Sequence, residues 1–388
     1  MTTVHHPALT QGKKSNLNDP DRGVPGETTL LGWATSVLAT AQLAGWSSAA
    51  FVESGSLRPF RVGKHPLVAV TVRIGGEPAH DVVIKTYRDD RGVDTLRLLS
   101  RVSSAGLARP SRDAVTRGLG WSGEHRALVT DRAPGTPWRA LLHAPAPWRS
   151  AGSAAVGRWL ATLQCSDADL PVRVGYRDMA DMVRQAAALG SLLPEHADKL
   201  AELSAAAARV DDVPAALVPS HGDLHPNNIH VLWSSRTSGS APGSPAVTAL
   251  DLDTVGLRRP AYDAGYALAQ LLVMSWLRRE SLVPGAEAGQ AFWRRWSRSA
   301  PASSDLDAVP AQFARALVQS LHYELAVLRN GRTDLAHAWC LLAETAMRDG
   351  MQELLERILT SPFLVEGFLA GGTGHDRGYR RNAVGDRS

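Results

Sequence analysis

The sequence has only two cysteines. Cys165 and Cys340 are far apart in a chain of 388 residues, and both stand in apolar, helix-like surroundings. Small secreted domains held by disulfides carry more cysteines at shorter spacings, and cysteine-based metal sites need several such ligands close together. This scarcity argues against a disulfide framework and a cysteine metal site, and it predicts a reducing, cytoplasmic setting.

Long apolar runs and basic clusters are lacking as well. The most apolar run, residues 264–277, contains Gln270 and Ser275, and it is shorter than the roughly 20 residues that cross a bilayer. The first 27 residues lack the apolar core of a secretory signal. The net charge is +4, and basic residues are interspersed with acidic ones instead of forming a stripe. We therefore expect no membrane span and no nucleic-acid partner.

The chain does have enough apolar residues for a substantial core, since 44% of its residues are hydrophobic. Residues 67–74 alternate as a strand, and residues 81–87 form the next strand after a Gly-Gly turn, which predicts a β-hairpin. Residues 156–163 place four apolar side chains on one helix face. From residue 263 onward the pattern is helical. The sequence thus predicts a β-rich part followed by a mainly helical part.

The most informative stretch is residues 220–231, Ser-His-Gly-Asp-Leu-His-Pro-Asn-Asn-Ile-His-Val, with Asp251 at the end of a later apolar strand. Asp223 can orient a hydroxyl and accept its proton, while Asn228 and Asp251 offer oxygen ligands for a hard cation such as Mg²⁺. Phosphoryl transfer needs little beyond such positioning, a divalent metal and one group that orients the nucleophile. These three residues are the minimum set for moving a phosphoryl group.

Three segments carry a resemblance to a known family. Residues 221–228, the Leu-Asp-Leu-Asp of residues 250–253 and the Pro-Ala-Tyr-Asp of residues 260–263 resemble the signature of the aminoglycoside and choline kinase-like phosphotransferases. That family is similar in fold to the protein kinases. The resemblance implies an α+β, bilobal protein kinase-like fold, with a small antiparallel β N-lobe and a larger, mainly helical C-lobe.

The resemblance also implies a role for each matching residue. Asp223 becomes the catalytic residue, Asn228 and Asp251 become the metal ligands, and Asp263 becomes a buried brace for the catalytic loop. His221 is then structural, and we assign no chemistry to the other histidines of the loop. The loop departs from the family at Asn227, where Gly is usual. Because Asn tolerates a left-handed backbone, we expect the turn to survive.

The expected nucleotide-binding residues lie earlier in the chain. The Val-Ile-Lys strand end resembles the position at which kinase-like folds contact the α and β phosphates, which assigns this role to Lys85. Kinase-like enzymes usually hold that Lys through a Glu of the next helix, but residues 93–103 contain no Glu, and Asp94 is the nearest acidic candidate. The turn expected to cover the phosphates contains a single glycine, Gly63.

Residues 127–131 and the following Pro-Gly pair indicate the strand and hinge between the lobes. On this basis we expect Asp131 and Ala133 to contact the nucleotide. The predicted organisation is a flexible N-terminus (1–27), a nucleotide-binding N-lobe (28–133), a C-lobe with the catalytic loop and the acceptor-binding helices (134–370), and a flexible tail (371–388).

The sequence thus predicts an ATP- and Mg²⁺-dependent phosphotransferase. Its partners are a nucleotide and a hydroxyl-bearing acceptor, either a small molecule (antibiotic, amino alcohol or sugar) or a peptide with a Ser or Thr side chain. The oligomeric state is left open. Arg258 and Arg259 beside the metal segment, and the lack of a concentrated acidic run after it, argue modestly against a dedicated polycation site.

Two alternatives belong to other functional classes. The missing helix Glu and the glycine-poor phosphate turn favour a catalytically impaired pseudokinase or regulator that only binds nucleotide. Imidazole ligands suit transition metals, so His221, Asp223, His225 and Asp251 could instead form the site of a metal-dependent hydrolase. That reading leaves Lys85 and the hinge without a role.

Overall fold

The computed structural model describes residues 27–41, 43, 51–53, 56–61, 67–73, 79–108, 111–173, 178–233, 245–301 and 305–361. Gly63 and the terminal segments expected to be flexible, apart from residue 27, lie outside these ranges. The chain forms two compact units that alternate along the sequence. Unit 1 comprises Met1–Arg97 and Arg117–Arg132, and unit 2 comprises Leu98–Thr116 and Ala133–Ser388. The lobe boundaries expected from the sequence stay a prediction.

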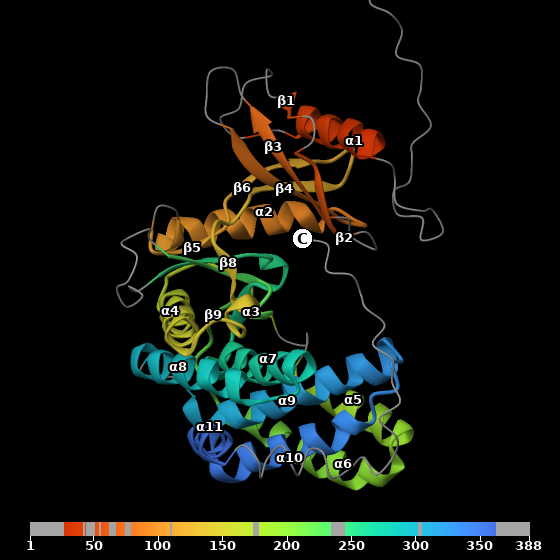
Figure 1. The fold of residues 1–388 in the computed structure, drawn as a ribbon, viewed down its shortest axis with the longest axis vertical. Helices are drawn as coiled ribbons and strands as arrows, with labels where there is room; N and C mark the ends of the chain where they lie inside the picture. Colours follow the sequence, from red (N-terminus) through yellow and green to blue (C-terminus); the bar gives the residue numbers. More distant parts are fainter. Residues whose placement is uncertain are drawn as a thin grey trace, which may run out of the picture. The chain divides into compact units, whose positions relative to one another are not determined.

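Unit 1 is built on an antiparallel sheet with the strand order β1-β3-β4-β7-β6, in which β2 also pairs with β3 (Figure 1). The strands are β1 (Phe51–Val52), β2 (Arg58–Arg61), β3 (Leu67–Arg73), β4 (His80–Thr86), β6 (Gly118–Ser122) and β7 (Ala127–Asp131). The predicted hairpin is confirmed as β3 and β4, in which Leu67 lies opposite Lys85.

One face of this sheet forms the core of unit 1. The valines of β3 at positions 68, 70 and 72 are buried with Ala34 and Val37 of helix α1 (Glu27–Thr40). Successive side chains of a strand point to opposite faces, and directly opposed residues of paired strands share a face. Lys85 therefore lies on the sheet face opposite the one that α1 covers.

Unit 2 contains two small sheets. The first has the order β5 (Asp113–Val115), β11 (Ala246–Ala249), β10 (Ile229–Leu232) and β8 (Thr136–Pro137). The second pairs β9 (Val218–Ser220) with β12 (Gly256–Arg258). The apolar strand expected before Asp251 is found as β11, whereas β5 and β8 are too short to carry a sequence pattern. The informative loop of residues 221–228 joins β9 to β10.

Helices make up the rest of unit 2. They are α3 (Trp138–Leu141), α4 (Ala146–Gln164), α5 (Met179–Leu192), α6 (Ala197–Ala208), α7 (Ala261–Arg279), α8 (Val283–Ser299), α9 (Val309–His322), α10 (Asp334–Asp349) and α11 (Met351–Thr360). Short 3₁₀ turns are η2 (Pro194–His196), η3 (Arg209–Asp212), η4 (Leu252–Thr254) and η5 (Leu306–Ala308), and π-helical turns are η1 (Ser103–Leu107) and η6 (Tyr323–Val327). Helix α2 (Arg91–Val102) carries the chain from unit 1 into unit 2.

Helix α7 lies at the centre of unit 2. Its residues are buried without a break from Ala261 to Ser275, and it packs against α8 and α9 (Figure 1). A helix that is apolar on all sides is expected in the middle of a large core. The predicted α+β fold class, with a small antiparallel sheet in one unit and a larger helical unit, is confirmed.

Other sequence expectations concern cysteines and membrane spans. Both cysteines are free, and burial raises the pKa of the Cys340 thiol to about 12. Within the described ranges, no helix is both long enough and apolar enough to cross a bilayer.

A partly buried ion pair connects helix α4 to strand β5. The guanidinium of Arg158 donates to both carboxylate oxygens of Asp113 at distances of 2.7 to 3.1 Å, and these side chains are only 14% and 11% exposed. Removing one partner of such a pair leaves the other charge desolvated without compensation. The pair thus fixes β5 beside β11, whose carboxyl end leads to Asp251.

We predict that Asp113→Ala lowers the free energy of unfolding by about 3 kcal/mol, because Arg158 then stays buried without its carboxylate. Urea unfolding followed by circular dichroism measures the change. The matched control is Glu353→Ala, which removes an exposed pair with Arg357 and should change stability by less than about 1 kcal/mol. Equal effects of the two substitutions would contradict a structural role for the Asp113 pair.

Candidate functional site

The loop between β9 and β10 is anchored by one buried carboxylate. Asp263, in the first turn of α7, is completely buried. Its Oδ2 accepts the backbone N–H of His221 at 2.6 Å, and its Oδ1 accepts the N–H of Gly222 at 2.9 Å. Burial raises the pKa of Asp263, although the two N–H donors and the charge of Arg258 act in the opposite direction. The loop is thereby fixed to the most buried helix of unit 2.

The imidazole of His221 connects the loop to the next strand. Its Nδ1 accepts the N–H of Asp223 at 3.2 Å, so the proton lies on Nε2, which donates to the carbonyl oxygen of Leu250 at 2.8 Å. The ring also packs edge-on against Trp159 of α4, with centroids 6.1 Å apart. Since both ring nitrogens are hydrogen-bonded within the protein, His221 is structural, as expected. The metal-dependent hydrolase alternative loses one of its ligands.

The turn of the loop requires glycine at position 222. Gly222 has a φ of +80°, and a Cβ there would lie 2.3 Å from the carbonyl oxygen of Thr254. The Thr254 hydroxyl in turn donates to the carbonyl oxygen of His221 at 3.0 Å. Asn227 is exposed and is not among the described residues with positive φ. The residues of this region with a left-handed backbone are therefore Gly222 and Asp251. The tolerance of Asn for that conformation is not needed at position 227.

The structure brings Asp223 and Asn228 into contact. The Asn228 amide Nδ2 donates to the Asp223 carbonyl oxygen at 3.0 Å, and it lies 3.4 Å from a carboxylate oxygen of the same residue. The carbonyl oxygen of Asn228 accepts the N–H of Leu250 at 2.8 Å, in register with the β10–β11 ladder. Asp251 is the next residue of the chain. All three predicted residues therefore belong to one local arrangement.

The oxygen donors of this arrangement suit a small hard cation. Because Nδ2 of Asn228 is turned toward Asp223, its amide oxygen is turned away from that residue. Together with the Asp251 carboxylate it offers the donors that Mg²⁺ prefers, and Mg²⁺ usually completes its shell with waters and substrate phosphates. Within the described part of the chain, three or more His, Cys, Asp or Glu side chains do not gather in a metal-binding group. An all-protein zinc site therefore does not fit these residues.

The residues predicted to bind the nucleotide lie on different strands and helices. Lys85 in β4 has its Nζ 5.1 Å from the ring centroid of Tyr87. Asp131 ends β7 and accepts a hydrogen bond from Nε of Arg117 at 3.1 Å. Asp94 is exposed on α2 and pairs with Arg97 at 3.1 Å.

Ala133 is buried and begins the second segment of unit 2. Gly63 lies outside the described residues. The nucleotide contacts of Lys85, Asp94, Asp131, Ala133 and Gly63 stay predictions.

Arg258 and Arg259 have structural roles that the sequence did not show. Arg258 is buried, stacks over the ring of Tyr262 at 4.5 Å and donates to the carbonyl oxygen of Arg173 at 2.8 Å. Arg259 donates from Nε to the Asp305 carboxylate at 2.9 Å. Both guanidinium groups therefore make contacts within unit 2. Their presence does not indicate whether the acceptor is cationic or anionic.

Other contributors to the site were also missed from the sequence. Trp159 was visible only as one member of an apolar helix face, and nothing in the sequence marked Thr254. Both act through contacts with a loop more than thirty residues away along the chain.

Comparison with known proteins supports a single family. Residues 68–306 match the model of the phosphotransferase enzyme family. A search of curated proteins gives no match. Similar solved structures include a choline/ethanolamine kinase family protein from Mesorhizobium loti, which is 15% identical, with a TM-score of 0.52, over 85% of this chain and 99% of that chain.

Two further similar structures are aminoglycoside phosphotransferases. The GDP and kanamycin complex of APH(2")-IIia is 14% identical, with a TM-score of 0.52, over 82% of this chain and 99% of that chain. A thermostable mutant of APH(4)-Ia in a ternary complex with AMP-PNP and hygromycin B is 13% identical, with a TM-score of 0.52, over 78% of this chain and 96% of that chain. At these identities the likeness establishes a shared fold, which confirms the predicted kinase-like architecture.

The family model begins in β3 and ends in η5, so it includes the hairpin with Lys85, the loop with Asp223 and the buried Asp263. It covers well over half of the sequence. The predicted kind of enzyme, a phosphotransferase with an alcohol group as acceptor, is confirmed by this match. The chain belongs to the phosphotransferase enzyme family.

Proposed function

We propose that the protein is an ATP- and Mg²⁺-dependent phosphotransferase that moves the γ-phosphoryl group to a hydroxyl of a small molecule or of a Ser or Thr side chain. The observation that carries this proposal is the loop held by Asp263, in which Asp223 and Asn228 are in contact beside the segment that contains Asp251. This arrangement favours an active enzyme over the pseudokinase alternative, because all three groups needed for transfer are present.

Each residue of the loop has a distinct role in the proposed reaction. Asp223 orients the acceptor hydroxyl and accepts its proton as the oxygen bonds to the γ-phosphorus, while the bond from that phosphorus to the bridging oxygen of ADP breaks. The Asn228 amide oxygen and the Asp251 carboxylate would hold Mg²⁺. The bound cation neutralises charge on the phosphates and so supplies the electrostatic part of catalysis.

The remaining predicted residues would bind the nucleotide. Lys85 would contact the α and β phosphates from the sheet face opposite α1, and Asp131 and Ala133 would lie near the adenine. Gly63 and Asp94 are further candidates, of which Asp94 would have to leave its exposed pair with Arg97 to reach Lys85. A cytoplasmic location stays a prediction as well.

Replacing the proton acceptor should stop the reaction without preventing nucleotide binding. We predict that Asp223→Asn lowers kcat by about 10²- to 10⁴-fold, because an amide cannot accept the hydroxyl proton, while the Kd for Mg·ATP stays near the wild-type value. A coupled assay of ADP release and a nucleotide titration measure the two quantities. Asp253→Asn, two residues after the proposed metal ligand, is the matched control and should keep most of the turnover. Near-normal kcat in Asp223→Asn would reject this base.

Removing the metal carboxylate should have a different signature. We choose Asp251→Asn because Asp251 has a φ of 58° and Asn tolerates the left-handed region better than Ala. The affinity for ATP in the presence of Mg²⁺ should fall by about tenfold or more, since the ligand loses its negative charge. The affinity measured in EDTA should not change. A substitution that weakens both affinities equally would speak against a metal ligand at this position.

The anchor of the loop gives a prediction about stability and pH. In Asp263→Asn the amide keeps one acceptor for two buried N–H donors, so unfolding should become easier by about 1–3 kcal/mol and kcat should fall with the loop geometry. Burial raises the pKa of Asp263 above 3.8, so the native state keeps a proton that the unfolded chain releases. The stability that Asp263 gives the wild-type protein therefore declines as pH rises from 3.8 to the raised native pKa.

Urea unfolding of both proteins across a pH series tests this prediction. The stability difference between wild type and Asp263→Asn should narrow as pH rises from 3.8 toward the raised native pKa. A difference that widens with pH would mean that the native state favours the ionised carboxylate. Equal stability at every pH would remove Asp263 as the anchor.

A further inference from the structure

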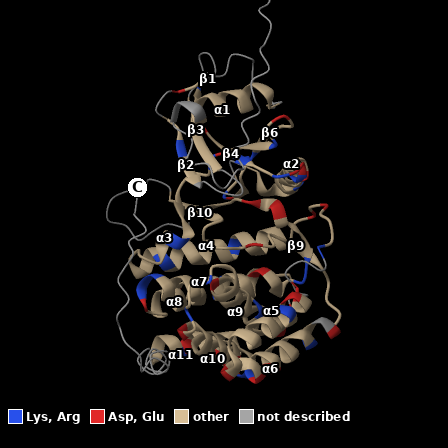
Figure 2. Ribbon diagram, turned by 90° about the vertical axis from the view of Figure 1, so that its right-hand side faces the viewer, with Lys and Arg blue, Asp and Glu red and all other residues tan. Residues whose placement is uncertain are grey.

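Basic residues gather where the turn after α3 meets the end of α7 in unit 2. Arg139 lies on α3, His143 follows that helix, and Arg278 and Arg279 end α7. We call these four residues the basic cluster. Figure 2 shows basic residues at α3 and close to α8, which follows α7. None of these four residues has a role in the proposed phosphoryl transfer.

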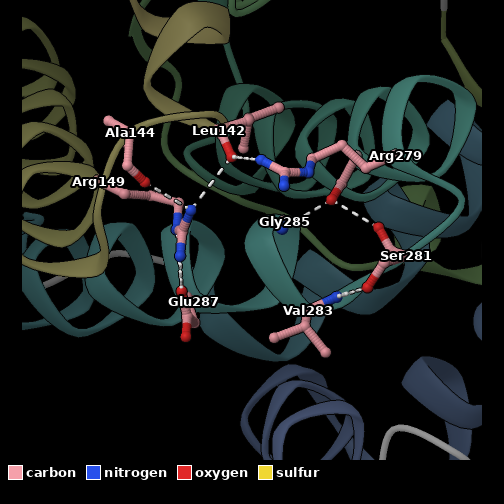
Figure 3. Close-up of polar contacts among 9 residues, drawn as sticks. Leu142, Ala144, Arg149, Arg279, Ser281, Val283, Gly285 and Glu287 are labelled. Atoms are coloured by element: carbon pink, nitrogen blue, oxygen red, sulfur yellow. Dashed lines mark hydrogen bonds and ion pairs between the residues drawn. The ribbon is translucent and has the colours of Figure 1, made fainter.

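The two elements that carry the cluster are joined by hydrogen bonds. Nη1 of Arg279 donates to the carbonyl oxygen of Leu142 at 3.3 Å, and Nη1 of Arg149 donates to the same oxygen at 3.1 Å and to the carbonyl oxygen of Ala144 at 2.9 Å (Figure 3). Two guanidinium groups therefore hold the short turn on both sides of His143. The backbone that carries His143 is thereby held to the end of α7.

The junction between α7 and α8 is also fixed. The Ser275 hydroxyl donates to the carbonyl oxygen of Ser281 at 2.7 Å and accepts the N–H of Gly285 at 3.0 Å (Figure 3). The backbone that follows Arg279 is thereby held to its own helix. A basic group at this end of α7 keeps a defined position relative to α3.

The positive charges of the cluster converge on one imidazole. Partial burial, followed by the charges of Arg279, Arg278 and Arg139, lowers the pKa of His143. The carboxylate of Glu287 pairs with Arg149. Within the described ranges, neither Arg139 nor Arg279 takes part in an ion pair. Arg139 and Arg279 therefore add positive charge to this part of unit 2.

The cluster is connected directly to the catalytic loop. The backbone N–H of Arg139 donates to the carbonyl oxygen of Pro226 at 3.1 Å. The preceding strand, β8, pairs with β10, which begins one residue after Asn228. Pro226 is three residues after Asp223, a stretch that spans at most roughly 10 Å. An arginine side chain on α3 is thus within reach of a small molecule whose hydroxyl meets Asp223.

We propose that the basic cluster binds an anionic group of the acceptor, a carboxylate or a phosphate, so that the substrate of this phosphotransferase is a hydroxyl compound that carries negative charge. The proposal deepens the proposed function and rests on it. Guanidinium groups match the geometry of both anions. A polycationic acceptor would place like charges together, which costs several kcal/mol at an interface. The kanamycin and hygromycin B complexes of the similar structures thus do not supply the acceptor class for this chain.

Binding of small matched probes tests the proposal without depending on turnover. The full chain, saturated with Mg²⁺ and a non-hydrolysable ATP analogue, is titrated calorimetrically with 3-hydroxypropionate, 1,3-propanediol and 3-amino-1-propanol, which share three carbons and a hydroxyl but differ in charge. Glycerol 3-phosphate and glycerol form a second pair, which separates phosphate from carboxylate recognition. At least one anionic probe should bind about tenfold more tightly than its neutral partner.

The variants assign that binding to the cluster. Arg139→Gln should weaken the anionic probe about tenfold through loss of a charge-assisted hydrogen bond, and Arg139→Lys should restore much of the loss. Arg298→Gln, an exposed substitution at the far end of α8, should bind as wild type does. Asp223→Asn should keep the preference for the anionic probe over its neutral partner, because Asp223 meets only the hydroxyl that both probes share. Failure of the proposed chemistry and failure of the anion site are thereby distinguished.

A second readout follows the imidazole within the cluster. An anion bound there offsets the arginine charges, so the pKa of His143 should rise on addition of the anionic probe, as measured by NMR titration with His143→Gln for assignment. Equal binding of the three-carbon probes, preference for the ammonium probe, or no effect of Arg139→Gln would overturn the proposal. Retention on anionic lipid vesicles that depends on Arg139, without binding of small anions, would also overturn it in favour of a membrane contact.

Discussion

The site depends on one carboxylate that accepts two consecutive backbone N–H groups. Asp263 stands at the beginning of α7, whose burial on all sides leaves it little freedom to move, and its oxygens fix His221 and Gly222. His221 then passes this constraint to the carbonyl oxygen of Leu250, next to Asp251. The proposed base and both proposed metal ligands are thus positioned from the same buried helix, although they stand on different segments. A hydrophobic core here determines the geometry of a polar site.

Charge is distributed unevenly around this loop. On one side lie the oxygen donors of Asp223, Asn228 and Asp251, which suit a divalent cation with its phosphates. On the other side, through Pro226 and α3, lie the arginines of the basic cluster. Arginines that are needed for packing, such as Arg258, are instead buried in the interior of unit 2. Residue type alone therefore does not distinguish a structural arginine from one that can meet a ligand.

Features that depend on local sequence were predictable. The β3–β4 hairpin follows from alternation around a Gly-Gly turn, and the placement of Asp223 and Asn228 in one loop follows from a motif with a fixed spacing. Features that depend on distant partners were not. The hydrogen bond from Arg258 to the carbonyl oxygen of Arg173 and the pairing of Arg259 with Asp305 join residues that are 85 and 46 positions apart. Asn227 departs from the family pattern, yet the residues with positive φ in this region are Gly222 and Asp251. Strands β5 and β8 are too short for any periodicity to show.

The path of the chain between the two units has a consequence for how the protein can be divided. Residues 98–116 belong to unit 2 although they are flanked on both sides by segments of unit 1. Within them, β5 runs parallel to β11, and its Asp113 pairs with Arg158 of α4. A fragment that ends after β7 would carry β5 away from its neighbours, and the complementary fragment would expose the edge of β11 from Val247 to Ala249. No single cut yields two self-sufficient halves, so dissection of this enzyme calls for circular permutation or an excised insert.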